Sequence, residues 1–133
     1  MYETSISSAR KWIELVNERS LETFAAAFTE DATLEATVLD APVVGAAKIR
    51  RFFDATRNMY ESLIFVHEAS TDSHTYIAWE GVFAGNAVAG VTVLCRNASG
   101  VVSNIWLHHR PLGQVLAFST ELAAVRSGPL SIG

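Results

Sequence analysis

The side chains best suited to acid–base chemistry are four histidines and a few carboxylates in the second half of the chain. His108 and His109 are adjacent in a run that is typical of a strand, so their rings should point to opposite faces of a sheet. Two such rings cannot share one metal ion, which argues against a zinc site. One imidazole in an apolar pocket could instead act as a base or an acid near neutral pH, or hydrogen-bond a ligand.

A carboxylate would complete a proton-transfer site, and Glu80 is the first candidate. It lies in a strand-like run whose register depends on the turn at Gly85 and Asn86. One register points Glu80 into a pocket, and the other points it towards solvent or a partner. An inward Glu80 would have a raised pKa, which is typical of catalytic carboxylates. His67 and Glu68 also alternate along a strand, and either of them could face inward.

The elements that must position these groups follow a simple order, with helices first and strands afterwards. Apolar residues recur at helical spacing over about residues 5–16, 20–30, 46–60 and 114–126. Strand-like runs cover about residues 32–39, 63–69, 75–83, 87–96 and 101–109. This order predicts an α+β fold, in which a cone-shaped, curved antiparallel sheet wraps around the N-terminal helices and leaves a pocket, with a helix at the C-terminus.

Length and composition predict one soluble domain over residues 1–126, followed by a loose tail at 127–133. The 133 residues are 50% hydrophobic and 18% charged, which is enough to form a core. Ten Lys and Arg residues and a net charge of −4 leave no basic stripe for nucleic acid. The chain has no apolar run of membrane-spanning length, no secretory signal and a lone Cys95, so we expect a cytoplasmic protein without a membrane partner.

The run at residues 87–94, Ala-Val-Ala-Gly-Val-Thr-Val-Leu, is apolar on both of its faces. One face can line the pocket, whereas the other must pack against something else. A second subunit is the simplest cover, so we expect a homodimer that forms through the outer face of the sheet.

Several segments carry a resemblance to a known family: WIELVN at 12–17, DATLE at 31–35, PVVG at 42–45 and IRRFF at 49–53. With these segments, residues 9–53 resemble the bacterial ketosteroid isomerases and SnoaL-like proteins of the nuclear transport factor 2-like superfamily without a gap. Residues 97–102 resemble the family's last hairpin, and Arg110-Pro111-Leu112 resembles a SnoaL-like ending. The resemblance implies the cone fold of these proteins.

The same resemblance implies that the isomerase chemistry is lost. In those isomerases an Asp base works with a Tyr and a protonated Asp that donate hydrogen bonds to the substrate oxygen. In the gapless register the Tyr falls on Trp12 and the base on Ala36, and in the last hairpin the second Asp falls on Thr92. Steroid isomerisation is therefore not expected, although the Trp12 indole and the Thr92 hydroxyl could still hold a carbonyl oxygen.

The resemblance also places His109 at a pocket-lining position, with Ile105 and Leu107 on the same wall by strand alternation. The alternative for His109 is a structural role at the edge of the sheet. The predicted pocket wall consists of Trp12, Ala36, Phe53, Gly90, Thr92, Leu94, Ile105 and Leu107.

Two functions follow from these observations. The first is a cofactor-free enzyme that isomerises, cyclises or dehydrates a small apolar substrate, with His109 as base and Trp12 and Thr92 as donors. The second is a non-catalytic ligand-binding module or a dimeric assembly module. No phosphate-binding loop or dinucleotide fingerprint is present, so no cofactor is expected. An inward carboxylate beside an inward histidine would favour the enzyme, and a wholly apolar pocket would favour the binding module.

Overall fold

The computed structural model describes residues 10–127, so residues 1–9 and 128–133 lie outside the described part. A helix over residues 10–16 is followed by α2 (Leu21–Ala25), β1 (Phe28–Ala36), β2 (Val43–Val44), α3 (Ala46–Arg57), β3 (Ser62–Ser70), β4 (His74–Phe83), β5 (Asn86–Arg96), β6 (Val102–Arg110) and α4 (Leu112–Ser127). The start of the predicted first helix, residues 5–9, and most of the predicted tail fall outside this part, and Ser127 ends α4.

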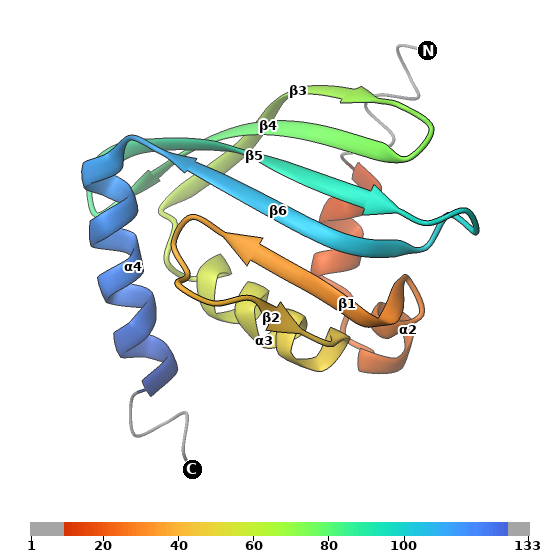
Figure 1. The fold of residues 1–133 in the computed structure, drawn as a ribbon. Coiled ribbons are helices and arrows are strands. Elements are labelled where there is room, and N and C mark those ends of the chain that lie inside the picture. The colour runs from red at the N-terminus through yellow and green to blue at the C-terminus, as the bar shows by residue number, and fades with distance from the viewer. Residues whose placement is uncertain (1–9, 128–133) are drawn as a thin grey trace.

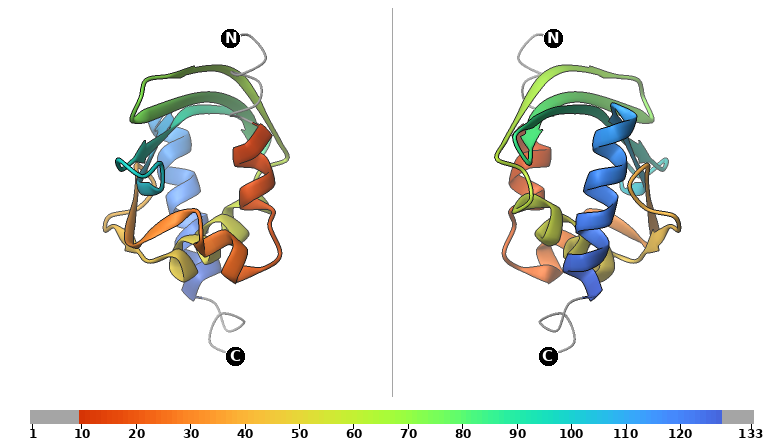
Figure 2. Two further views of the ribbon diagram at one scale, coloured as in Figure 1. Left: turned by 90° about the vertical axis from the view of Figure 1, so that its right-hand side faces the viewer. Right: turned by 90° about the vertical axis from the view of Figure 1, so that its left-hand side faces the viewer.

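The strands form one sheet in the order β2-β1-β6-β5-β4-β3 (Figure 1). Strands β3 to β6 pair antiparallel with their chain neighbours, as the predicted meander requires. β1 instead runs parallel to β6, so the sheet is mostly rather than wholly antiparallel. Figure 2 shows the sheet arching over the N-terminal helix and α3, with α4 alongside one end. The predicted α+β cone is confirmed.

The predicted second helix is wrong in its C-terminal half, because α2 ends at Ala25 and β1 already begins at Phe28. Phe24 and Phe28 have helical spacing, and their buried rings pack 4.7 Å apart. The carbonyl oxygen of Ala27, however, accepts a hydrogen bond from the Val102 amide at 2.9 Å, and Phe28 pairs with Val102. Pairing with a strand 74 residues later cannot be read from local apolar spacing.

The core lies between the concave face of the sheet and the helices. Its fully buried side chains are Phe24, Leu34, Ile49, Ile77, Ile105, Phe118 and Leu122. α3 buries Ile49, Phe52 and Thr56 but ends at Arg57, so Tyr60 lies in the connection to β3 rather than on the helix. From α4, Phe118 packs against Phe83 and Tyr60 with ring centroids 4.9 and 5.0 Å apart.

The outer face of the sheet carries an aromatic group that no described helix covers (Figure 2). Val93 is buried there between Tyr76 and Trp106, its partners on the two neighbouring strands. His74 packs on both rings, at 6.0 Å from Tyr76 and 5.9 Å from Trp106. The chain's own aromatic residues thus cover part of the apolar outer face, and the homodimer stays a prediction. No helix within residues 10–127 is long and apolar enough to span a membrane.

Candidate functional site

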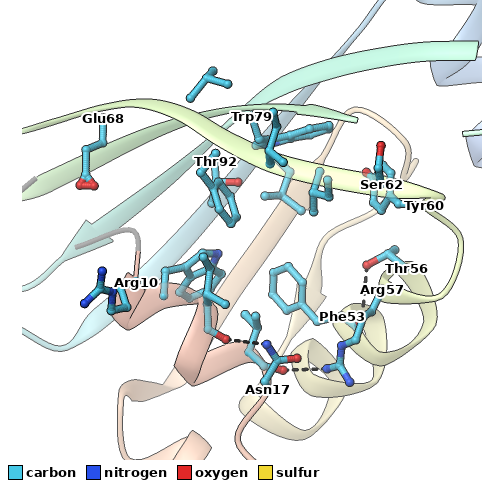
Figure 3. Close-up of a pocket in the computed structure, with 18 of the residues that line it drawn as sticks. Arg10, Asn17, Phe53, Thr56, Arg57, Tyr60, Ser62, Glu68, Trp79 and Thr92 are labelled. Atoms are coloured by element: carbon cyan, nitrogen blue, oxygen red, sulfur yellow. Dashed lines mark hydrogen bonds between the residues drawn. The ribbon is translucent and has the colours of Figure 1, made fainter. Parts of the chain in front are cut away.

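A cavity of about 990 Å³ lies between the concave sheet, the N-terminal helix and α3 (Figure 3). Trp79 and Thr92 lie on the sheet side, and Phe53 lies across from them on α3. Ile13, Val16, Phe52, Phe53 and Phe65 make much of the wall apolar. This volume lies at the upper end of the range of about 300–1,000 Å³ found for small-molecule sites.

Several predicted wall residues line this cavity and several do not. The lining includes Trp12, Phe53, Thr92, Leu107 and His109. It does not include Ala36, Gly90, Leu94 or Ile105. Ile105 is fully buried in the core, and Leu94 faces a separate hollow of about 490 Å³ behind Trp12. At Gly90 the ring of Trp79 covers the backbone, since its Cζ2 atom would lie 2.5 Å from a Cβ there.

Glu80 does not reach the cavity. On β4 the buried residues are Thr75, Ile77, Trp79 and Phe83. Glu80 is exposed on the other face, where it pairs with Ala89 of β5. Of the two orientations considered from the sequence, the one towards solvent or a partner is observed. A base acting from inside the cavity therefore has to be another residue.

Among the described residues, Glu68 is the single carboxylate that lines the cavity. β3 is an edge strand with a bulge between Phe65 and His67, and all of residues 62–68 contribute to the wall. Glu68 is half-buried and His67 is exposed. Figure 3 shows Glu68 and Arg10 at one end of the cavity, and Tyr60 at the other end. We call these the charged end and the aromatic end.

The aromatic end is built around Gly90. In the sheet, Gly90 pairs with Trp79 on one side and with His109 on the other. A Cβ on residue 90 would lie 2.5 Å from Cζ2 of Trp79, so only glycine admits the indole there. The Trp79 ring consequently reaches His109 edge-on, with centroids 5.3 Å apart, although the two residues are two strands apart.

His109 is held by Thr37, the residue that follows β1. The backbone N–H of His109 donates to Oγ1 of Thr37 at 2.9 Å, and Nδ1 of the ring lies 2.8 Å from the same oxygen. Burial lowers the pKa of His109 to about 4; the Leu107 backbone acts in the opposite direction, and His108 lowers it slightly further. The imidazole is therefore neutral at pH 7.

Tyr60 is a cavity residue that the sequence did not single out. Its ring packs against Trp79 at 5.7 Å and Phe118 at 5.0 Å, the same two rings that flank His109. Burial raises the pKa of the phenol well above its usual value, so it stays a hydrogen-bond donor. The available signal was a tyrosine continuing the apolar face of the preceding helix, which is also typical of plain core packing.

Several polar groups on the cavity wall make no hydrogen bond within residues 10–127, and among them are the Tyr60 and Thr92 hydroxyls and the Trp12 indole N–H. A buried polar group without a partner costs on the order of 1–3 kcal/mol. Water or a ligand in the cavity would remove this cost. These groups are therefore positioned to bind polar atoms of a guest.

The helix side of the cavity is held together by Arg57. Its Nη2 donates to the carbonyl oxygen of Val16 at 2.7 Å (Figure 3). The same nitrogen donates to Oδ1 of Asp54 at 2.9 Å. Asn17 donates to the carbonyl oxygen of Ile13 at 2.9 Å. The charged groups thus lie at the rim and at the charged end, whereas the aromatic end is neutral.

Solved structures with this fold include enzymes, all at low sequence identity. A steroid delta-isomerase from Pseudomonas aeruginosa is similar over 95% of this chain and 93% of its own, with 13% identity and a TM-score of 0.80. A protein with a cystatin-like fold from Silicibacter pomeroyi matches over 90% and 84%, with 13% identity and a TM-score of 0.78. At this identity the likeness shows the fold alone.

A third similar structure is SalBIII, an epoxide hydrolase/cyclase-like enzyme with a role in pyran ring formation in the polyether salinomycin. It matches over 82% of this chain and 92% of its own, with 16% identity and a TM-score of 0.59. A comparison of the sequence with curated proteins finds no match. The SnoaL-like domain family, in contrast, matches residues 9–109. The chain belongs to the SnoaL-like domain family.

Proposed function

We propose that this protein binds a small, largely apolar molecule that carries at least one polar atom, in the cavity between the N-terminal helix and the sheet. The observation that carries the proposal is an apolar wall containing the hydroxyls of Tyr60 and Thr92, which have no partner within the described residues. Apolar walls provide affinity at about 25 cal/mol per Å² buried, and a few polar groups fix the orientation of a ligand.

The distribution of charge narrows the class of ligand. Arg10 and Glu68 lie at the charged end, and Arg57, on α3, is paired with Asp54. Tyr60 and the neutral His109 share the same two neighbouring rings and form the aromatic end. A molecule that fills the cavity therefore buries a neutral end between aromatic rings. Burying an unpaired charge there would be costly, because no opposite charge on the described wall faces it.

Proton-transfer catalysis is the second candidate function, and the position of His109 favours it. The lowered pKa of about 4 is close to the value of about 4.6 of the Asp base in ketosteroid isomerases. A base of that strength suffices in the isomerases when hydrogen-bond donors stabilise the developing oxyanion. Cofactor-free isomerisation, cyclisation or dehydration fits this set of groups. Steroid isomerisation is not proposed, because no carboxylate stands at Trp12, Ala36 or Thr92.

An assembly role is the alternative to ligand binding. It is supported by the aromatic group of His74, Tyr76 and Trp106 on the outer face, where the Tyr76 side chain remains 40% exposed. We propose that a second copy of the chain packs on this face. Such a dimer is compatible with a working cavity, because the cavity is lined by the other face of the sheet together with the N-terminal helix and α3.

The binding proposal is tested by thermal shift and titration calorimetry against steroids, aromatic polyketides, terpenoids and fatty acids. At a ligand concentration of about 100 times Kd, the native state gains about 2.7 kcal/mol, which raises Tm by several degrees. Val16→Phe, which narrows the cavity wall, should abolish the shift, and the outer-face variant Glu80→Gln should retain it. Absence of a shift in every class, or an equal shift in Val16→Phe, would refute binding in this cavity.

A further inference from the structure

We infer that Thr37 holds His109 as the neutral tautomer with its hydrogen on Nε2, so that the aromatic end of the cavity recognises a hydrogen-bond-accepting oxygen of the ligand. The ligand class in this inference rests on the proposed binding function, whereas the tautomer does not. Thr37 is a positioning residue, because it acts on the ligand through His109.

The first step is to account for the hydrogen of the Thr37 hydroxyl. A threonine hydroxyl offers one hydrogen and two lone pairs. One lone pair accepts the backbone N–H of His109 at 2.9 Å. The hydrogen then has two acceptors within reach, Nδ1 of His109 at 2.8 Å and the carbonyl oxygen of Leu107 at 3.5 Å.

The shorter distance strongly favours Nδ1 of His109 as the acceptor of the Thr37 hydroxyl hydrogen. Hydroxyl hydrogen bonds to oxygen span about 2.5–3.0 Å, so the contact with Leu107 is at best weak. The Leu107 oxygen also already accepts the backbone N–H of Thr37 at 3.0 Å. The Thr37 hydroxyl therefore donates to Nδ1 of His109, which must carry a lone pair.

The other tautomer, with its hydrogen on Nδ1, allows fewer good hydrogen bonds. If Nδ1 carried the hydrogen, it could donate to the Thr37 oxygen or to the Leu107 backbone. The hydrogen of the Thr37 hydroxyl would then be left with the 3.5 Å contact to Leu107. Because burial keeps the ring neutral at pH 7, an unprotonated Nδ1 places the single hydrogen on Nε2.

The Nε2–H group is then available to a ligand as a donor, so in this tautomer His109 cannot be the base of the second candidate function. His109 lines the cavity, and its one ring hydrogen bond of known length within residues 10–127 is that of Nδ1 with Thr37. Its ring shares the neighbours Trp79 and Phe118 with Tyr60, whose hydroxyl is also a donor. A neutral imidazole N–H can polarise a carbonyl without bringing a charge into an apolar site. Carbonyl, ester and ether oxygens fit this end, and an ammonium group does not.

The tautomer is measured directly on the free protein by long-range ¹H–¹⁵N NMR of ¹⁵N-histidine-labelled protein at pH 7, with His109→Gln to assign the signals. We expect a pyridine-type Nδ1 and a pyrrole-type Nε2 for His109. Thr37→Val should lose this preference, and Thr37→Ser should restore it. A pyrrole-type Nδ1 in the wild type, or an unchanged pattern in a folded Thr37→Val, overturns the inference. If Thr37→Val does not fold, the wild-type pattern decides.

Recognition of an acceptor is tested separately with a matched pair of probes, α-tetralone and its hydrocarbon analogue tetralin. The wild type should bind the ketone at least about 5-fold more tightly, as expected for one added hydrogen bond. The ratio should fall towards one in His109→Phe. Equal affinities in the wild type would overturn acceptor recognition and leave the NMR result untouched, and no binding of either probe would count against the ligand class.

Discussion

The indole of Trp79 lies against the backbone of Gly90 so closely that Cζ2 is 2.5 Å from the position a Cβ would take. The same Cβ would also lie 2.3 Å from the carbonyl oxygen of His108. Glycine normally weakens the interior of a strand. Residue 90 is a glycine because the Trp79 ring and the His108 carbonyl oxygen leave no room for a Cβ. The aromatic end of the cavity depends on this contact, because it brings Trp79 to His109.

Gly90→Ala should destabilise the protein by about 1–3 kcal/mol, the usual cost of overpacking. Neither Trp79 nor the His108 backbone can yield without disturbing the sheet. Urea unfolding measures the loss, and near-ultraviolet circular dichroism should report a changed tryptophan environment. Gly113→Ala is the matched control: its Cβ meets nothing within 4 Å, and helical Ala is favoured over Gly by up to about 1 kcal/mol. A Gly90→Ala protein as stable as the wild type would contradict this packing.

Tyr60→Phe should weaken ligand binding without weakening the fold. The phenol has no hydrogen bond within the described residues, so its removal should leave the unfolding free energy unchanged or raise it by up to about 1 kcal/mol. Affinity for a ligand found in the screen should fall about 5–10-fold, which titration calorimetry can measure. Tyr76→Phe, on the outer face, should bind like the wild type. Undiminished affinity in Tyr60→Phe would show that the phenol does not bind the ligand.

Stability should fall as the pH drops from about 6.5 towards 4, because His109 takes up a proton more readily in the unfolded chain. The folded pKa is lowered from 6.5 to about 4, so in this window the unfolded state binds the extra proton. The effect is at most about 1.4 kcal/mol per pH unit. Above pH 6.5 both states are neutral at this residue, and the effect vanishes.

His109→Phe isolates this contribution from all other titrating groups. The difference in unfolding free energy between wild type and variant, measured by urea unfolding at several pH values, should change steadily between pH 6.5 and 4 and stay constant above. A difference independent of pH would mean that the folded imidazole titrates as it does in the unfolded chain.

The proposed dimer predicts a solution mass of twice the 14.4 kDa of one chain in light scattering after size exclusion. Tyr76→Asp places a charge in the aromatic group of the outer face and should give a monomer. Leu116→Asp is the control, since Leu116 is 59% exposed but lies on α4 rather than on that face. A wild-type monomer at micromolar concentration would leave the exposed aromatic group without a partner.

Local patterns in the sequence predict the elements better than they predict the site. Alternating residues and turn signals predict the four-strand meander, because period two and the Gly85 turn are local properties. The early end of α2 and the parallel pairing of β1 with β6 depend on contacts with residues far along the chain. Such long-range contacts cannot be predicted from the local spacing of apolar residues.

The site depends even more on such distant contacts. His109 could be placed on the inner face, but its partner Thr37 is 72 residues away and belongs to no motif. Glu80 differs from its inward neighbour Trp79 by one position, and only the observed register shows which of the two lines the cavity. Tyr60 lies beyond the end of α3, where helical spacing no longer determines the direction of a side chain.

The hydrogen bond from Arg57 to the Val16 carbonyl has a consequence for how this cavity can change. It joins the N-terminal helix to α3 and so fixes the helix side of the cavity, whereas Thr92 and His109 lie on the sheet side. The size of the guest and its functional group are therefore selected by residues that do not touch one another. Substitutions at this contact can admit larger guests while the donors on the sheet stay in place, and a change of donor can alter the chemistry while the two helices keep their spacing.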